Sequence, residues 1–518
     1  MKNSSQAAKS VILMVMLSLG SKFLGFIREV LIAAKFGSGI ETDAFFVAMT
    51  GTLLITGLIS NAVSTTFIPV LSEIKVKESK EGKLYHANNI NNFIFFISVL
   101  LVGIGWFISP LLVNLLAKGF TGEQFILTVK LTRIGLPMIL FSGTIGVLTA
   151  YLQSEQRFFS TSLIGYPFNL IYIFFLSLLS SRFGIKGLMI TAVIAVLSQL
   201  LILLPEAKLS DFKFACVFDL KDSYVHKAIF LSIPVLIGVA INDLNIIVDR
   251  TLASSLETGS ISALNYANRL INLILTVFIS AITTVVFPIL SNEYNKNNIN
   301  GLKRVMAYGV NFILIITIPA TVGLVVLAKP IVEVAFERGA FDASATEMTS
   351  QALIFYSIGL VAIALQSLIT RVYYSLQDTK SPMINGAISV GFNIVLNIIL
   401  VRYMAHAGLA FATSTATTIA TALMFYELKR KVGSLGIISY FKCGAKAMLA
   451  SVIMGIIAYI VYHGTYNILG VSKLYNSISL MLAIVVGVIV YGIICYVLGI
   501  TEIKDIVNRI VKYMSKKY

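Results

Sequence analysis

The stretch Ser21-Lys22-Phe23-Leu24-Gly25-Phe26-Ile27-Arg28-Glu29 lies inside an otherwise apolar segment that runs from Ala8 to Phe36. A charge at the centre of a bilayer costs roughly 2.5–3.5 kcal/mol on insertion scales, so a charged side chain in such a segment usually faces a protein interior or a watery cavity. Lys22 and Arg28 point about 120° apart on a helix, which lets them line two walls of one wide cavity. The stretch therefore predicts a membrane transporter built around a cavity, and its cations favour an anionic substrate.

The composition of the whole chain predicts a membrane protein. Of its 518 residues, 57% are apolar and only 12% are charged, whereas a soluble protein has about 25% charged residues. The net charge of +16 is explained by basic residues in cytoplasmic loops that meet anionic lipid, so no nucleic-acid partner is expected. The three cysteines, Cys216, Cys443 and Cys495, lie far apart and predict neither a disulfide framework nor a metal site.

Fourteen apolar stretches are long enough to cross a bilayer as helices, which takes about 20 residues each. They lie at 9–34, 43–71, 90–117, 126–152, 158–181, 187–205, 228–253, 262–290, 305–328, 347–370, 383–401, 408–426, 445–463 and 475–499. Lys and Arg are far more frequent in the connections that share a side with the N-terminus, so both termini are predicted to be cytoplasmic. The sequence thus predicts an all-α polytopic membrane protein.

Short matches recur along the chain at spacings between 219 and 224 residues. The pairs are Phe67–Ser72 with Val286–Ser291, Leu152-Gln153 with Leu376-Gln377, Asn169 with Asn393, Gly187-Leu188 with Gly408-Leu409, and Arg28 with Arg250. Because the repeat unit holds six spans, an even number, both copies have the same orientation and should be related by a pseudo-twofold axis along the membrane normal. The prediction is a six-helix lobe at 1–205, a cytoplasmic linker at 206–227, a second six-helix lobe at 228–430, accessory helices 13 and 14 within 431–500, and a basic cytoplasmic tail at 501–518.

Two arginines inside predicted spans, Arg28 and Arg269, are the first candidates for substrate contact. Arginine can bind a phosphate or diphosphate through two parallel hydrogen bonds. Lys22 is a further candidate for the same cavity. The alternative is that these cations pair with acids and merely hold helices together; the acids in question are Glu29, Asp43 and Asp249.

Other polar residues in the spans allow two interpretations each. Asp43 opens the second span, where a carboxylate accepts hydrogen bonds from helix-start amides; a gating role is the alternative. Asp249 lies deep in the seventh span, Asn393 and Asn397 share one helix face, and Thr413 lies near the start of the twelfth span. Such oxygens form a candidate site for Na⁺ or a proton relay, and ordinary hydrogen bonding between helices is the alternative.

The sequence contains no catalytic motif that would indicate an enzyme. It has no P-loop, no HExxH and no GxSxG pattern, and its four histidines do not cluster. ATP hydrolysis is therefore not expected, and no cofactor is predicted apart from a coupling ion.

Several stretches together resemble the MurJ (MviN) family of lipid II flippases, in the MOP exporter superfamily. The first-span stretch quoted above, followed by Thr42-Asp43-Ala44-Phe45-Phe46, is similar to the family's first-span signature. Further similar stretches are Tyr266–Leu270, Phe336–Phe341 and Leu376–Pro382, so the resemblance extends over spans 1 to 12.

This resemblance implies transport of an undecaprenyl-diphosphate-linked disaccharide-pentapeptide from the inner to the outer leaflet of a bacterial cytoplasmic membrane by alternating access. It places the cavity cations on Lys22, Arg28 and Arg269, their acidic or gating partners on Glu29 and Asp43, and a cation site for Na⁺ or H⁺ on Asp249, Asn393, Asn397 and Thr413. The expected partners are lipid II and membrane lipids. A monomer is expected, and contact with cell-wall synthases is left open.

The chain departs from the family pattern at two places. Residues 50–61 carry no charge, where many family members have arginines, and Asn397 stands where an acid can occur. Three alternatives therefore stay open: export of another polyprenyl-linked oligosaccharide, cation-coupled export of drugs, and enzymatic work on polyprenyl phosphates. A drug exporter should have an acidic cavity, and an enzyme should have clustered carboxylates or histidines at a membrane surface; neither pattern is present in the sequence.

Overall fold

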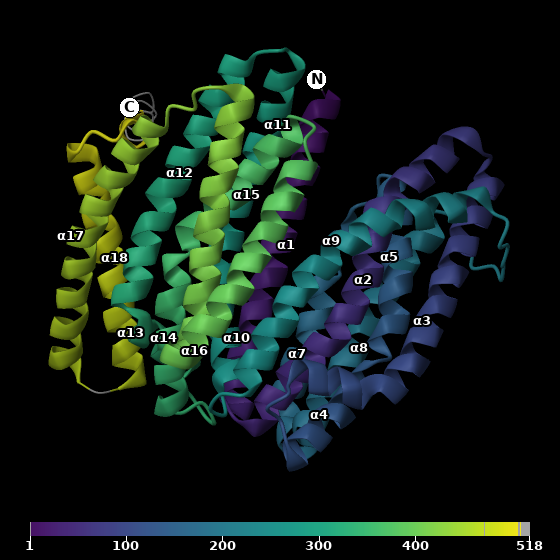
Figure 1. The fold of residues 1–518 in the computed structure, drawn as a ribbon, viewed down its shortest axis with the longest axis horizontal. Coiled ribbons are helices and arrows are strands. Elements are labelled where there is room, and N and C mark those ends of the chain that lie inside the picture. The colour runs from purple at the N-terminus through teal and green to yellow at the C-terminus, as the bar shows by residue number, and fades with distance from the viewer. Residues whose placement is uncertain (1, 471, 506–507, 509–518) are drawn as a thin grey trace. The chain divides into compact units, whose positions relative to one another are not determined.

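The computed structural model describes residues 2–470, 472–505 and 508, and every regular element in this part of the chain is a helix (Figure 1). Hydrocarbon offers the backbone no hydrogen-bond partner, so an apolar spanning segment satisfies its own N–H and C=O groups by forming a helix. The predicted all-α fold is confirmed. The elements are α1 (Lys2–Phe36), α2 (Ile40–Lys77), α3 (Lys80–Leu116), α4 (Gly122–Gly135), α5 (Met138–Ser154), α6 (Phe159–Leu163), α7 (Gly165–Leu178), α8 (Ser180–Leu209), α9 (Ser223–Ser254), α10 (Ser260–Ile274), the π-helical turn η1 (Leu275–Ile279), α11 (Ser280–Asn295), α12 (Ile299–Val326), α13 (Ala328–Phe336), α14 (Ala343–Ile358), α15 (Leu360–Ser375), α16 (Lys380–Val432), α17 (Ile437–Leu469) and α18 (Lys473–Val497).

Among the described residues, ten helices are long and apolar enough to cross a membrane, and two bent helix pairs raise the number to twelve. The bent pairs are Ser260–Ile279 with Ala281–Asn295, at 43°, and Ala343–Ile358 with Leu360–Ser375, at 46°. The predicted number of fourteen is not confirmed. Two differences account for the number: α1 is not among the twelve, and α16, which is counted once, consists of two helices that meet at a break at Ala405, between the predicted spans 383–401 and 408–426.

The chain divides into two compact units. Unit 1 consists of residues 1–262 together with 339–341, and unit 2 consists of 263–338 and 342–518. This division falls after α9, whereas the predicted linker at 206–227 overlaps the end of α8 and the start of α9. The two six-helix lobes and their symmetry therefore stay a prediction.

Unit 1 is organised around α2, which packs against α3, α4, α5 and α9, while α1 packs along α7. The side chains of α2 that enter the core recur at helical spacing, and they are Val63, Phe67, Val70, Leu71 and Ile74. Residues three, four and seven positions apart share one helix face. The apolar pattern of the sequence therefore sets which face of α2 is buried.

Unit 2 is built around α12, which packs against α11, α15 and α17, and α17 packs in turn against α18 (Figure 1). On α18 a row of small or aromatic residues is buried at four-residue spacing, namely Ala483, Gly487, Tyr491 and Cys495. Large aliphatic side chains such as Val488 and Ile489 are exposed on the same helix. Small residues at a helix interface let backbones approach in lipid, so α18 has one face for the protein and one for hydrocarbon.

Two unusual backbone conformations recur 221 residues apart, once in each unit. Gln156 and Gln377 both have φ of 59° just after a helix end. Gly184, with φ of 56°, and Ala405, with φ of 48°, interrupt α8 and α16. A residue with a side chain rarely adopts positive φ, so these coincidences support the internal repeat.

The same helix ends correct one of the sequence matches. Arg157 N donates to Leu152 O, and Asp378 N donates to Tyr373 O. Leu152 is therefore equivalent to Tyr373. The proposed match of Leu152-Gln153 with Leu376-Gln377 is wrong by three residues, because both sequences carry Leu-Gln close to one helix end but not in the same turn.

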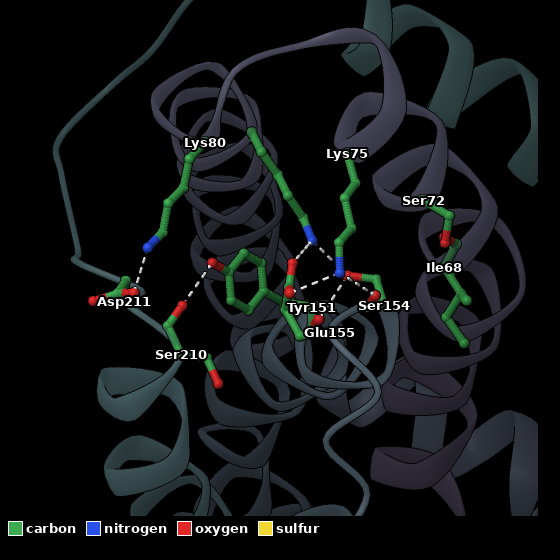
Figure 2. Close-up of polar contacts among 10 residues, drawn as sticks. Ile68, Ser72, Lys75, Lys80, Tyr151, Ser154, Glu155, Ser210 and Asp211 are labelled. Atoms are coloured by element: carbon green, nitrogen blue, oxygen red, sulfur yellow. Dashed lines mark hydrogen bonds and ion pairs between the residues drawn. The ribbon is translucent and has the colours of Figure 1, made fainter. Parts of the chain in front are cut away.

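Charged side chains join helix ends in unit 1, on the side that is predicted to be cytoplasmic (Figure 2). Lys75 Nζ lies 2.8 Å from Glu155 Oε2, Lys83 pairs with the other Glu155 oxygen, and Lys80 Nζ lies 2.5 Å from Asp211 Oδ2. Partial burial tends to raise the pKa of Glu155, but the hydrogen bonds from Lys75 and Lys83 outweigh it and lower the pKa. The two Glu155 pairs tie α2 and α3 to the residue that follows α5, and the Lys80–Asp211 pair ties α3 to the segment after α8.

Candidate functional site

Arg28 is enclosed by polar and aromatic groups of α1 and α7. Its Nη2 donates to Glu29 Oε1 at 2.7 Å, and its Nη1 donates to Asn169 Oδ1 at 3.1 Å. Its Cζ lies 5.3 Å from the ring centroid of Phe168 and 5.1 Å from that of Tyr172, within the range of cation–π attraction. Only 15% of the Arg28 side chain is exposed. The guanidinium is thus fixed in place by four neighbouring side chains.

Small residues let α1 and α7 approach closely enough to build this site. A Cβ on Gly20 would lie 2.2 Å from Tyr166 Oη, and one on Gly165 would lie 1.9 Å from Ser21 Oγ. Asn169 crosses the same contact, since its Nδ2 donates to Ser21 O at 3.0 Å and to Gly165 O at 2.8 Å. Asn169 therefore locks the two helices together while it orients Arg28.

The sequence allowed two roles for Arg28, contact with substrate or pairing with an acid. The structure shows that Arg28 pairs with Glu29. Glu29 is 3% exposed, so the pair is nearly enclosed. Lys22 is exposed on α1, and Arg269 is exposed on α10 in unit 2. The roles of these three cations toward a substrate stay predictions. Sequence reasoning missed the two rings, because Phe168 and Tyr172 look like ordinary lipid-facing residues in an apolar span.

Asp43 is buried, and its carboxylate accepts three hydrogen bonds. The donors are Gly259 N at 2.7 Å, Ser262 N at 2.8 Å and Ser262 Oγ at 2.5 Å. The helix that contains Asp43 begins at Ile40 with Gly39 as its N-cap, so the predicted cap on that helix is wrong. Asp43 instead binds amides at the start of α10, where negative charge is favourable. It thereby joins α2 to the turn between α9 and α10.

Glycines allow a close backbone contact between the end of α1 and a distant segment of unit 1. Ala340 N donates to Ala34 O at 2.9 Å. A Cβ on Gly37 would lie 2.3 Å from Ala340 O, and one on Gly339 would lie 2.1 Å from Ala34 O. Both glycines also have φ above 60°. The stretch Phe336–Phe341 was noted in the sequence because it resembles the family. In the structure, its residues Gly339 and Ala340 make a close backbone contact with the end of α1.

Three of the four candidate cation ligands come together in α16. Asn397 Nδ2 donates to Asn393 Oδ1 at 2.7 Å, and Asn393 Nδ2 donates to Thr413 Oγ1 at 3.2 Å. These bonds connect the parts of α16 on either side of the break at Ala405. The fourth residue, Asp249, lies on α9 in unit 1. Ordinary helix–helix hydrogen bonding is thus present, and a ligand role for the four residues stays a prediction.

Comparison with known proteins gives a consistent result. The family model described as "Lipid II flippase MurJ" matches residues 32–496. A "Probable lipid II flippase MurJ" of Vibrio cholerae is 31% identical over 453 residues, which cover 83% of this chain and 85% of the relative. One of Rickettsia prowazekii is 27% identical over 508 residues, which cover 95% and 98%.

Solved structures extend the comparison to the fold. A lipid II flippase MurJ in an inward closed conformation aligns with a TM-score of 0.79 and 27% identity, over 96% of this chain and 100% of that one. An inward-facing multidrug resistance MATE family transporter of the MOP superfamily aligns with a TM-score of 0.68 and 12% identity, over 81% and 98%. At that identity the second likeness concerns the fold alone.

Proposed function

We propose that this chain, which belongs to the MurJ family of lipid II flippases, moves lipid II from the inner to the outer leaflet of the bacterial cytoplasmic membrane. It is a multi-pass membrane protein and a transporter rather than an enzyme. Lipid II is an undecaprenyl-diphosphate-linked disaccharide-pentapeptide, so its head group is anionic and its tail is apolar. Alternating access would carry the head group through a cavity while the tail stays in lipid.

The observation that best supports a substrate-binding site is the guanidinium of Arg28, which is held in place by its neighbours. An arginine has five N–H donors, and its hydrogen bonds to Glu29 and Asn169 use two of them. The remaining donors can bind phosphate oxygens bidentately. Because the side chain is already held by two rings, binding costs little further conformational entropy. Lys22 and Arg269 supply further positive charge for the diphosphate.

We infer that an ion gradient or the membrane potential resets the carrier, since the sequence contains no ATPase motif. The candidate ion is Na⁺ or H⁺, held by Asp249 with Asn393, Asn397 and Thr413. Support comes from the hydrogen-bonded set of amide and hydroxyl groups in α16. The excess of Lys and Arg on one side supports cytoplasmic termini. A monomer is the proposed state, and contact with cell-wall synthases is left open.

The test is leaflet translocation of labelled lipid II in cells depleted of their own flippase. Wild type is compared with Arg28→Ala and with the double variant Arg28→Ala/Glu29→Ala, in which no buried carboxylate is left without its partner. The matched control is Arg304→Ala, which removes an exposed arginine near the start of α12. Membrane levels are measured for each variant.

We expect wild type and Arg304→Ala to restore translocation. The double variant should reach the membrane at normal level and lose translocation at least about tenfold, as expected for loss of a charge-assisted contact. Full activity of the double variant would contradict the role of Arg28. A wild type that reaches the membrane without translocating lipid II would contradict the substrate, and the uncharged residues 50–61 would then favour another lipid-linked glycan.

A further inference from the structure

A polar pocket of about 580 Å³ opens in unit 2 between the α10–η1–α11 segment and α15. Its volume lies within the range of roughly 300–1,000 Å³ that is typical of small-ligand sites. Six of the eleven described residues that line it carry amide or hydroxyl side chains, and they are Asn272, Thr276, Thr283, Gln366, Ser367 and Thr370. Ionisable residues are rare in membrane helices and mark watery paths or ligand sites, and Arg371 is among the residues that line this pocket. The pocket is thus a candidate binding site that the sequence analysis did not identify.

One wall of the pocket is an irregular piece of helix. The π-helical turn Leu275–Ile279 separates α10 from α11, and the two helices bend by 43° there. Both ends of this turn, Leu275 and Ile279, line the pocket. π-helical turns are rare, and they are frequently found at functional sites. This backbone feature is independent of the polar lining and marks the same place.

Arg371 contributes a charge whose position is fixed by aromatic rings. Its Cζ lies 5.7 Å from the ring centroid of Phe287 and 6.0 Å from that of Tyr374. In the part of the chain that the structure describes, no carboxylate pairs with Arg371 and no hydrogen bond uses its N–H groups. The guanidinium is exposed to the pocket that it lines. It is therefore oriented but not neutralised, which is the state of an arginine that receives an anion.

We propose that this pocket binds the peptide part of the lipid-linked substrate through a carboxylate on Arg371. A carboxylate fits the planar fork of a guanidinium. Arg371 is the one charged side chain among the described residues that line the pocket, so a carboxylate is a better match than a diphosphate with its higher charge. The hydroxyls of Thr283, Ser367 and Thr370 donate to backbone carbonyls four residues earlier in the chain, so their oxygens can accept from peptide N–H groups. The amide of Gln366 can donate to a peptide C=O. This inference rests on the proposed function, because lipid II is the molecule that carries the peptide.

The test compares two substrates in vesicles that contain the purified full chain. One is the undecaprenyl-diphosphate disaccharide with its pentapeptide, and the other is the same molecule without the peptide. Wild type, Arg371→Gln, Arg371→Lys and the control Arg304→Ala are measured for the substrate concentration that gives half-maximal translocation. Thermal unfolding of each variant is recorded to show that it is folded.

We expect Arg371→Gln to raise this concentration about tenfold or more for the peptide-bearing substrate, as for a lost charge-assisted hydrogen bond. The peptide-free substrate should show no change, and Arg371→Lys should recover part of the loss. An equal effect of Arg371→Gln on both substrates, or none on either, would overturn the peptide site. A wild type that translocates neither substrate would instead contradict the proposed function.

Discussion

Arg28 in unit 1 and Arg371 in unit 2 are both held against two aromatic rings of their own unit. Arg28 is also paired with the buried carboxylate of Glu29, whereas Arg371 has no such partner within the described residues. Removing one member of a buried ion pair leaves the other charge uncompensated. The charge of Arg28 is thus part of the fold as well as of the site, while the charge of Arg371 is available to a ligand.

The largest expected difference between these arginines is in stability. Arg28→Ala should lower the free energy of unfolding by about 3–5 kcal/mol, because it leaves Glu29 buried and unpaired. Arg371→Ala should lower it by less than about 1 kcal/mol, since only contacts with two rings are lost. Denaturant unfolding in detergent micelles, followed by circular dichroism, measures both values.

The control for this comparison is Arg28→Ala/Glu29→Ala, which removes both charges of the pair. It should regain part of the stability that Arg28→Ala loses, because no isolated buried charge remains. Equal losses for Arg28→Ala and Arg371→Ala would show that the two sites do not differ in the way that the ion pair indicates.

A second comparison concerns the carboxylates at helix ends outside the spans. Asp378 accepts hydrogen bonds from Lys431 and from Ser381. Burial tends to raise its pKa, but the Lys431 and Ser381 hydrogen bonds outweigh it and lower the pKa from 3.8 to about 2. A lowered pKa means that the stabilisation is present above the ordinary value and is lost as pH falls through about 2.

The expected effect of Asp378→Asn is therefore a loss of about 0.5–1 kcal/mol above pH 4, a value discounted for solvent screening. The loss should shrink as the pH is lowered toward 2. Unfolding free energies of both proteins across this pH range measure it. A difference that is independent of pH would contradict the ionised pair. The pKa of Glu155 is also lowered, so Glu155→Gln serves as the matched variant in unit 1.

The smallest expected effect tests whether the two units share a backbone. Gln156 and Gln377 both have φ of 59°, a conformation that glycine adopts without strain. Gln156→Gly and Gln377→Gly should each stabilise the protein by up to about 1 kcal/mol, since relief of strain is partly offset by the greater freedom of the unfolded chain. Thermal unfolding of the two variants measures the gain. If one substitution stabilised the protein and the other destabilised it, the two positions would not be equivalent.

Much of the fold could be predicted from the sequence because helix formation in lipid is a local requirement. Each long apolar stretch has to satisfy its own backbone, so the all-helical fold was predicted and confirmed. The number of spans was not confirmed, because α1 is not among the twelve candidates and the two helices of α16, which meet at Ala405 between two predicted spans, are counted as one. The division into units also differs from the predicted linker, since α9 packs on α2 and α3 for reasons that a composition profile does not contain.

By itself the sequence determined the helical membrane fold, the family and the short list of charged residues that a bilayer would otherwise exclude. Only the tertiary structure decided which groups these residues meet: Asn169 and two rings for Arg28, and the start of α10 for Asp43. It also placed Arg371, which the sequence did not single out, in a polar pocket. The physical reason is the distance along the chain over which each effect acts. Hydrophobicity and helical period act over a few neighbouring residues, whereas Arg28 and Asn169 are 141 positions apart and meet only because small residues let two helices pack closely.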